Sequence, residues 1–228
     1  MGHTEESGVF GTRIKAGADL FLDLLFPPKC PFCGHLLEKG LLLCPDCQRS
    51  LPWLAGAAGE KAVELTGGCV SSLRYEGLVR EGVHAFKFRG KRIRGETFGR
   101  LIAQCVQDHG LTADLVSWPP LSPKRLRKRG YDQAQLLAEM VGKQLALPVA
   151  RTLNKAERPA QSGLEEEGAR RSNLLGAYSA CDPEGIRGKT ILLVDDVVTT
   201  GATLSECAKT LRLAGAERIL CATLARAR

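Results

Sequence analysis

Two adjacent carboxylates followed by a hydroxyl-rich loop are the residues of this chain best suited to chemistry. Four apolar residues, 191–194, lead into Asp195 and Asp196, and a threonine-rich loop around Gly201 comes next. Glycine lets the backbone approach an anion closely, and N–H groups at the start of a following helix point toward it. The carboxylates can accept hydrogen bonds from sugar hydroxyls or help to hold a hydrated Mg²⁺. These features predict a site for a phosphorylated sugar.

The same stretch also fits a structural turn between a strand and a helix, capped by a threonine, although a cap needs no acid pair. It is not a Walker loop, because it lacks the terminal Gly-Lys pair. It resembles the phosphoribosyl diphosphate (PRPP) signature of type I phosphoribosyltransferases: apolar residues, two acids and a Thr-Thr-Gly-x-Thr loop. The resemblance implies that Asp195 and Asp196 are catalytic acids that bind the ribose hydroxyls. It also implies that the 5-phosphate is held by Val198, Thr199, Thr200, Gly201, Ala202 and Thr203.

Four cysteines near the start of the chain have the spacing of a zinc site. They form two Cys-x-x-Cys knuckles, Cys30 with Cys33 and Cys44 with Cys47, and Gly34 follows the first knuckle. Four thiolates in this pattern hold Zn²⁺ tetrahedrally and leave no open position for catalysis. Disulfides or redox pairs are the alternatives. We expect a structural zinc module.

A basic segment follows a predicted strand at residues 114–118 and forms a second candidate anion site. Five cations lie within residues 124–129, and Asp132 follows as the predicted cap of a helix. Such a cluster suits a diphosphate, although a basic surface loop has the same composition. The residues that we assign to diphosphate are Ser122, Lys124, Arg125 and Arg129.

Another basic segment, residues 87–94, carries Phe88 between its cations. It could contact a nucleic-acid backbone, and a solvated helix end is the equally weighted alternative. Residues 151–173 form a long hydrophilic connection, which inside a compact domain often acts as a functional loop.

The elements that must position these groups alternate between strands and helices. The pattern predicts an α/β domain over residues 69–228, preceded by a Gly- and Pro-containing linker at 51–68, a zinc module at 29–55, and a tail with an amphipathic helix at 1–28. That first helix could pack on its neighbour or bind a partner. The predicted strands are 69–75, 114–118, 178–180, 191–194 and 218–224, and the predicted helices are 79–90, 98–106, 132–145 and 204–214.

Composition narrows the class of protein. The 228 residues carry a net charge of +7, which favours anionic partners such as phosphorylated metabolites or nucleic acid. No apolar run approaches the roughly 18 residues of a membrane span. Nine cysteines without a secretory signal indicate a reducing cytoplasm, with four on metal and the rest mostly buried.

Taken together, residues 26–228 resemble the ComF competence proteins, which are amidophosphoribosyltransferase-like. Three departures from that pattern fall in the predicted diphosphate segment: Pro119 stands near an expected valine, Ser122 in place of a histidine, and Asp132 in place of an asparagine. The landmarks of the resemblance are the paired knuckles, residues 75–77, 87–90, 120–121, 125–130, 161–164 and 170–173, and the phosphate loop.

The ComF resemblance implies a type I phosphoribosyltransferase-like domain with a mainly parallel central sheet flanked by helices, plus a small N-terminal zinc-ribbon module. It implies a flexible loop, with Gln161, Arg170 and Asn173, that closes over the sugar diphosphate. It also implies a link to DNA uptake and to the competence helicase machinery.

Three functions compete on this evidence. The first is an enzyme that transfers phosphoribosyl from PRPP, with Mg²⁺, to a nitrogen acceptor that the sequence does not identify. The second is a non-catalytic protein that senses PRPP or handles single-stranded DNA. Only 5% of the residues are aromatic, which leaves few platforms for stacking bases. The third is a zinc-stapled scaffold with a relict phosphate loop, which retention of both acids and three threonines disfavours.

Overall fold

The computed structural model describes residues 27–38, 40–88, 92–156 and 176–227, and it divides the chain into two compact units, Met1–Ser50 and Leu51–Arg228. The predicted helix within residues 1–28 lies outside the described residues. So does the segment with Gln161, Arg170 and Asn173.

The described part of the first unit is small. An antiparallel bridge joins Lys29 to Leu36 across the first cysteine knuckle, and α2 (Pro45–Ser50) carries the last cysteine of the second. The turn closes through a hydrogen bond from the Gly34 N–H to the Cys30 carbonyl, and Gly34 adopts φ +78°. That left-handed conformation strains other residues, which explains the glycine.

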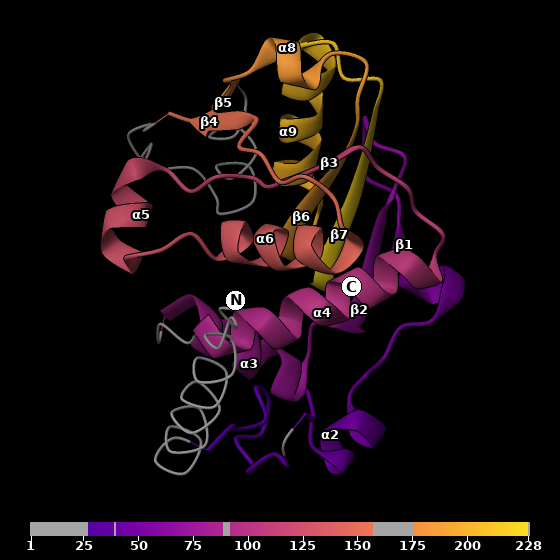
Figure 1. The fold of residues 1–228 in the computed structure, drawn as a ribbon, viewed down its shortest axis with the longest axis vertical. Coiled ribbons are helices and arrows are strands. Elements are labelled where there is room, and N and C mark those ends of the chain that lie inside the picture. The colour runs from indigo at the N-terminus through magenta and orange to yellow at the C-terminus, as the bar shows by residue number, and fades with distance from the viewer. Residues whose placement is uncertain (1–26, 39, 89–91, 157–175, 228) are drawn as a thin grey trace, which may run out of the picture. The chain divides into compact units, whose positions relative to one another are not determined.

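A five-stranded sheet forms the centre of the second unit, in the order β1-β2-β7-β6-β3 (Figure 1). All neighbouring strands are parallel except the edge pair β1 and β2. The prediction of an α/β fold with a mainly parallel sheet is therefore confirmed. The strands are β1 (Glu60–Lys61), β2 (Cys69–Arg74), β3 (Leu115–Ser117), β6 (Thr190–Val198) and β7 (Arg218–Arg226).

Helices cover both faces of this sheet, as a buried parallel sheet requires. On one face α4 (Arg92–Asp108) and α6 (Gln133–Leu145) contact each other and the strands. On the other face α9 (Ala202–Leu213) shares an apolar cluster with Ile191 and Leu193 of β6. The remaining helices are α3 (Gly77–Phe88), α5 (Pro123–Arg129), α8 (Pro183–Ile186) and the short 3-10 turn η1 (Gly56–Gly59).

Three segments contain more regular structure than was predicted. The strand predicted to stop at residue 194 continues to Val198, because β7 pairs with it along its whole length. The basic segment, for which no helix was predicted, contains a short helix, α5, which begins at Pro123, a residue whose fixed φ suits the first helical position. The predicted linker at 51–68 contains β1, which pairs with β2.

A second, two-stranded antiparallel sheet stands apart from the central one. Its strands are β4 (Leu153–Lys155) and β5 (Tyr178–Ala180), and they flank residues 157–175, which the structure does not describe. The predicted hydrophilic connection at 151–173 thus begins with a strand. The predicted strand at 178–180 is confirmed.

Candidate functional site

The two carboxylates predicted as catalytic acids lie side by side near the end of β6. Asp196 is buried, with 4% of its surface exposed, and Asp195 is half-buried. The backbone N–H of Asp196 donates to Oδ1 of Asp195 at 2.8 Å, which orients the first carboxylate. The strand therefore delivers two acids, in fixed positions, to the carboxyl edge of a parallel sheet, where α/β folds bind ligands.

Burial and the neighbouring carboxylate make Asp195 hard to ionise. Burial raises the pKa of Asp195 to about 7, and the negative charge of Asp196 adds to the rise. Lys87 and the Asp196 N–H act in the opposite direction. Asp195 consequently exchanges its proton near neutral pH, which is the range in which a hydrogen-bonding or proton-exchanging site is useful.

Lys87 is a residue of this site that the sequence pattern did not reveal. It lies in the last turn of α3, and its Nζ is 2.9 Å from Oδ2 of Asp196. Burial acts to lower the pKa of Lys87, but the charge and hydrogen bond of Asp196, together with the charge of Asp195, outweigh it and the pKa rises. The sequence analysis placed Lys87 in a basic segment that could contact nucleic acid or form a solvated helix end, whereas its ammonium group faces the acid pair. No local motif marks that contact.

The predicted phosphate loop connects β6 to α9. Gly201 stands at the N-cap position of α9 with φ +84°, and it has no side chain with which to cap the helix. A Cβ at this position would lie 3.1 Å from Cγ2 of Val63. Thr199 and Thr200 are exposed, and the Thr200 hydroxyl accepts a hydrogen bond from the Ala202 N–H. The start of α9 thus presents amide and hydroxyl donors to an anion.

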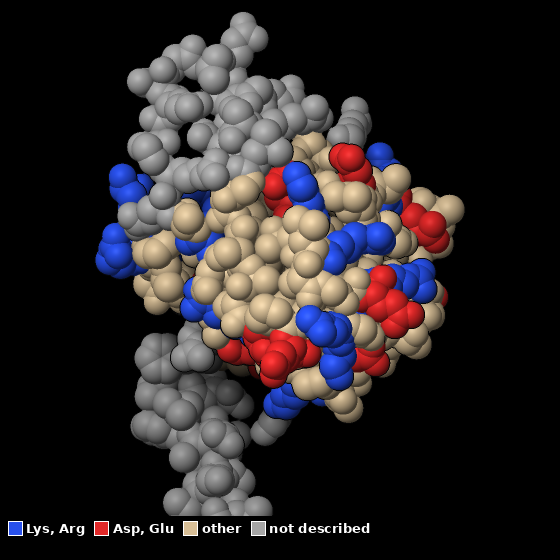
Figure 2. Space-filling model, turned by 90° about the horizontal axis from the view of Figure 1, so that it is seen from above, with Lys and Arg blue, Asp and Glu red and all other residues tan. Residues whose placement is uncertain are grey.

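The predicted diphosphate residues lie on and beside α5. Ser122 occupies its N-cap position, Lys124 and Arg125 are exposed, and Arg129 is half-buried. Figure 2 shows Lys and Arg gathered at the left edge of the molecule, the side on which Figure 1 places α5. Four cations on one short exposed helix suit an anionic ligand: Lys124, Arg125, Arg127 and Lys128.

Asp132 anchors the connection between α5 and α6, and its predicted role as a helix cap is confirmed. Its Oδ1 accepts hydrogen bonds from the N–H groups of Ala134 and Gln135, at 3.1 and 3.3 Å. Its Oδ2 accepts one from the Leu121 N–H at 2.9 Å. A single carboxylate therefore ties the segment before α5 to the start of α6.

Lys155 is a second residue that the sequence pattern did not reveal. Its Nζ donates to the Tyr178 hydroxyl at 2.7 Å, across the β4–β5 pair. Burial lowers the pKa of Lys155, the positive charge of Arg125 lowers it further, and Asp195 acts in the opposite direction. These influences place Lys155 within electrostatic range of both the acid pair and α5.

The four cysteines of the first unit converge as predicted. Their sulfur atoms all lie within 4.8 Å of one another, with Cys33 and Cys44 3.5 Å apart. Sulfurs bonded to one tetrahedral zinc at about 2.3 Å are roughly 3.8 Å apart, whereas a disulfide requires about 2.05 Å. All nine cysteines are free thiols, and Cys69, Cys105, Cys207 and Cys221 are buried.

One of these thiols is prepared to ionise. Burial acts to raise the pKa of Cys30, but N–H groups of Cys33, Cys44 and Phe32 outweigh it and lower the pKa to about 7. A metal binds the thiolate form, so Cys30 is the ligand ready to bind it at neutral pH, whereas burial raises the pKa of Cys33 and Cys47. The geometry fits a structural Cys₄ zinc site: Cys30, Cys33, Cys44 and Cys47.

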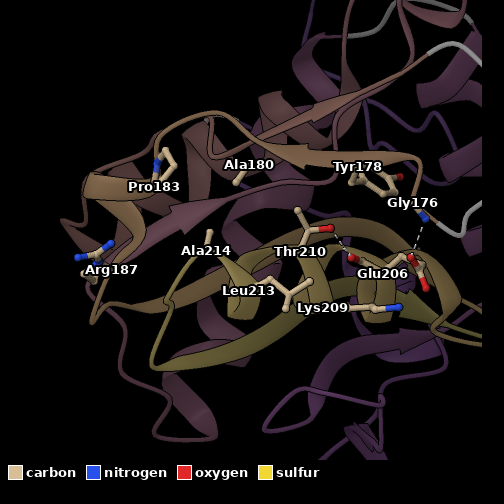
Figure 3. A pocket seen from close by; sticks show the side chains of 10 residues that line it. All are labelled: Gly176, Tyr178, Ala180, Pro183, Arg187, Glu206, Lys209, Thr210, Leu213 and Ala214. Atoms are coloured by element: carbon tan, nitrogen blue, oxygen red, sulfur yellow. Dashed lines mark hydrogen bonds between the residues drawn. The ribbon is translucent and has the colours of Figure 1, made fainter.

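A separate groove of about 510 Å³ runs along α9, β5 and α8 (Figure 3). Its lining includes Tyr178, Glu206 and Thr210, whose polar atoms already have partners within the fold. The Gly176 N–H donates to the Glu206 carboxylate, and the Thr210 hydroxyl donates to the Glu206 carbonyl (Figure 3). None of the predicted site residues that the structure describes lines this groove.

Comparisons with known proteins match two parts of the chain to known domain families. The phosphoribosyl transferase domain family matches residues 132–228, and the double zinc ribbon domain family matches residues 21–61. Competence protein F of Haemophilus influenzae is 32% identical over 208 residues, covering 88% of this chain and 85% of its own. DNA utilization protein YhgH of Salmonella typhi is 28% identical, covering 86% and 90%. Competence protein ComFC of Bacillus subtilis is 26% identical, covering 80% and 70%.

None of the helices within residues 27–38, 40–88, 92–156 and 176–227 has the length and apolar character needed to cross a bilayer.

Proposed function

The chain belongs to the family of competence protein F, and we propose that its second unit binds PRPP and transfers the phosphoribosyl group to an acceptor with a nucleophilic nitrogen. The observation that carries this proposal is the acid pair of β6, followed by the threonine loop and by helix α9, whose N-cap residue Gly201 has no side chain that could displace an anion. Carboxylates accept from sugar hydroxyls and helix N-termini bind phosphate. One strand–loop–helix therefore offers complementary groups to both parts of ribose 5-phosphate.

In this proposal each group has a separate task. Asp195 and Asp196 accept hydrogen bonds from the ribose 2- and 3-hydroxyls. The loop from Val198 through Thr199, Thr200, Gly201 and Ala202 to Thr203 holds the 5-phosphate through N–H and hydroxyl donors. The diphosphate lies toward Ser122, Lys124, Arg125 and Arg129. Gln161, Arg170 and Asn173 belong to the segment that we propose closes over the ligand.

The transfer step breaks the bond between ribose C1 and the diphosphate oxygen and forms a bond between C1 and the acceptor nitrogen. Diphosphate leaves with the bonding electron pair, so negative charge grows on it in the transition state. The acceptor nitrogen supplies the electron pair of the new bond and releases a proton to water. Lys124, Arg125 and Arg129 would stabilise that charge. The acid pair would hold the ribose so that C1 stays in place while the two bonds exchange.

Mg²⁺ fits the donor set, because carboxylate oxygens are the ligands that it prefers. Asp195 would hold it, directly or through water, since Oδ2 of Asp196 already faces Lys87. When bound, Mg²⁺ would neutralise part of the diphosphate charge.

Calorimetric titration of PRPP with Mg²⁺ into the full chain tests the proposal. We expect micromolar binding, and no binding for the double variant Asp195→Asn/Asp196→Asn. Asp108→Asn, an exposed acid on α4, is the matched control and should bind as the wild type does. Zinc content should stay at one ion per chain in all three proteins. Equal PRPP affinity in the double variant would refute the site assignment.

A second candidate function is binding of single-stranded DNA, which the names of the relatives suggest and the exposed cations of α5 support. Neutralising phosphates with lysine and arginine makes affinity fall steeply with salt. We expect Arg127→Gln/Lys128→Gln to weaken DNA affinity and flatten its salt dependence, with PRPP binding unchanged. DNA affinity that does not respond to salt would exclude this function.

The cellular setting is part of the proposal. Nine free thiols support a reducing cytoplasm, because thiols in oxidising compartments form disulfides. Membership of the competence family supports the competence helicase machinery as a partner during DNA uptake. Co-purification of the tagged chain with that machinery, with and without added single-stranded DNA, tests the second point.

A further inference from the structure

A tyrosine at the end of β2 has no task in the proposed transfer step. Tyr75 directly follows the last residue of β2, and it is half-buried. The chain has three tyrosines, and the structure describes them all. The hydroxyls of Tyr131 and Tyr178 form hydrogen bonds within the fold. The described residues provide Tyr75 with no hydrogen-bond partner and no ring partner for its side chain, so its phenol is available to a ligand.

Main-chain hydrogen bonds fix Tyr75 beside the phosphate loop. Its N–H donates to the Arg226 carbonyl at the end of β7, at 2.8 Å. The Ala227 N–H donates in turn to the Val198 carbonyl at the end of β6, at 2.9 Å. The strand register places Arg74, Arg226 and Val198 in one row, so Tyr75 is level with the first residue of the loop that follows β6. Neighbouring strands are about 4.8 Å apart, which puts Tyr75 two strands, or roughly 10 Å, from β6.

The strand order gives the direction from which an acceptor must approach. The sheet runs β1-β2-β7-β6-β3, with α5 following β3 at one end of this order and β1 and β2 at the other (Figure 1). In the proposed function the diphosphate lies toward α5, and the ribose lies at the acid pair of β6. Displacement requires the attacking and leaving atoms to be in line on opposite sides of C1. The acceptor therefore approaches over the ends of β7 and β2, where Tyr75 is.

We propose that Tyr75 is the stacking platform of the acceptor subsite and that the acceptor is a planar nitrogen heterocycle. The inference rests on the proposed function, because the place assigned to the diphosphate gives the direction of approach. Aromatic side chains bind planar heterocycles face to face, whatever the pattern of hydrogen-bonding groups on the ring edge. A ring nitrogen forms the bond to ribose C1 as the C1–O bond breaks. Diphosphate leaves with the bonding electron pair, and the nitrogen releases its proton to water.

Charged groups around Tyr75 suit the polar edge of such a ring. The side chains of Arg74 and Glu76 are 45% and 48% exposed, and their closest charged atoms are 4.0 Å apart. An ion pair this exposed contributes little to stability, so both groups are available to a ligand. Burial lowers the pKa of Lys87, and Tyr75 is among the neighbouring groups that raise it, after Asp196. The Tyr75 phenol therefore lies near the acid pair as well as near the strand ends.

Two explanations compete with a stacking platform. Tyr75 could only shape the turn between β2 and α3, in which case removing its ring would affect every ligand of the site alike. The acceptor could also be ammonia or an aliphatic amine, which needs no aromatic surface. A stacked heterocycle gains affinity from the ring, whereas the sugar phosphate binds independently of it. Ligands that share ribose 5-phosphate and differ in the base separate these explanations.

Calorimetry on the full chain makes this comparison with adenosine 5′-monophosphate, uridine 5′-monophosphate and ribose 5-phosphate, each with Mg²⁺. We expect at least one nucleotide to bind the wild type between about fivefold and a hundredfold more tightly than ribose 5-phosphate. Tyr75→Leu should lose that advantage and Tyr75→Phe should keep it, both with the wild-type affinity for ribose 5-phosphate. Leu213→Ala, which truncates a side chain 82% exposed on α9, is the control and should change none of the three affinities.

Three results overturn the inference and leave the proposed PRPP site standing. The first is a wild type that binds both nucleotides no more tightly than ribose 5-phosphate. The second is a base advantage that survives in Tyr75→Leu. The third is a loss of affinity in Tyr75→Leu that is the same for all three ligands, which assigns Tyr75 a structural role. A wild type that binds neither ribose 5-phosphate nor PRPP refutes the proposed function, and the inference falls with it.

If Tyr75→Leu does not fold, the wild type decides. Nuclear magnetic resonance of the chain with ¹³C-labelled tyrosine rings gives one set of signals for each of the three tyrosines, and Tyr75→Phe identifies the set that belongs to Tyr75. A bound nucleotide should shift that set much more than ribose 5-phosphate does. Equal shifts with the nucleotides and ribose 5-phosphate overturn the inference.

Discussion

Replacing each acid of the pair by its isosteric amide should change the stability of the second unit in opposite directions. Asp195→Asn removes a carboxyl that is hard to ionise, and the asparagine oxygen can still accept the Asp196 N–H. Asp196→Asn removes the anion that balances Lys87. We expect the first variant to be more stable than the wild type at pH 8 and the second to be less stable.

The size of the first effect follows from the pKa of Asp195. Burial raises that pKa from 3.8 to about 7, and each unit corresponds to about 1.4 kcal/mol. As the pH rises, Asp195 loses its proton at a lower pH in the unfolded chain than in the folded one. The contribution of Asp195 to the free energy of unfolding therefore falls between about pH 4 and pH 7 and stays low above pH 7. The full difference is on the order of 4 kcal/mol, and the buried amide of asparagine retains part of the cost. We expect a gain of about 1–3 kcal/mol at pH 8.

The second effect is a loss. Breaking a buried ion pair by removing one partner costs about 3–5 kcal/mol. The Lys87 side chain is 23% exposed and can regain some water, and relief of Asp195 offsets a further part. We expect Asp196→Asn to lose about 1–2 kcal/mol.

Urea unfolding followed by tryptophan fluorescence measures both effects. Both tryptophans of the chain, Trp53 and Trp118, lie in the second unit, Leu51–Arg228, so the fluorescence follows the unfolding of that unit. At pH 5 the gain of Asp195→Asn should be much smaller than at pH 8. The reasoning fails if Asp195→Asn is less stable than the wild type at pH 8, or if Asp196→Asn is as stable as the wild type at that pH.

Three further predictions concern residues outside the acid pair. Cys47→Ser should lower zinc content and disrupt the first unit, as measured by metal analysis and proteolysis, whereas Cys181→Ser, at an exposed thiol, should retain one zinc per chain. Asp132→Ala should lower the free energy of unfolding by about 1–2 kcal/mol through loss of the cap, and Asp132→Asn should retain most of the wild-type stability. A urea midpoint of the alanine variant equal to that of the wild type would contradict the role of the cap. Gly201→Ala should reduce the free energy of PRPP binding by more than it reduces the free energy of unfolding, because the positive φ and the nearby Val63 methyl force the loop to shift. Unchanged PRPP affinity by calorimetry would argue against a phosphate cradle at this loop.

Features that depend only on residues close together in the chain could be predicted from the sequence. The cysteine spacing predicted a Cys₄ cluster, and the alternation of strand and helix segments predicted an α/β domain, because both depend on local pattern. The mainly parallel arrangement of its sheet was implied by the resemblance to the ComF proteins. The cap at Asp132 was predicted for the same reason, since a cap contacts N–H groups two and three residues away. The roles of the acid pair, the phosphate loop and α5 toward PRPP remain predictions.

Contacts between distant segments were decided by the tertiary structure alone. β6 continues past its acids because β7 pairs with it, and nothing within residues 190–198 specifies that length. Lys87 approaches Asp196, and Lys155 approaches Tyr178, only because packing brings their helices and strands together. A lysine in a basic cluster has the same local sequence whether its ammonium faces water or a carboxylate. These charged side chains are brought together because apolar helix faces are buried against the sheet. The free energy of that burial comes from contacts throughout the fold.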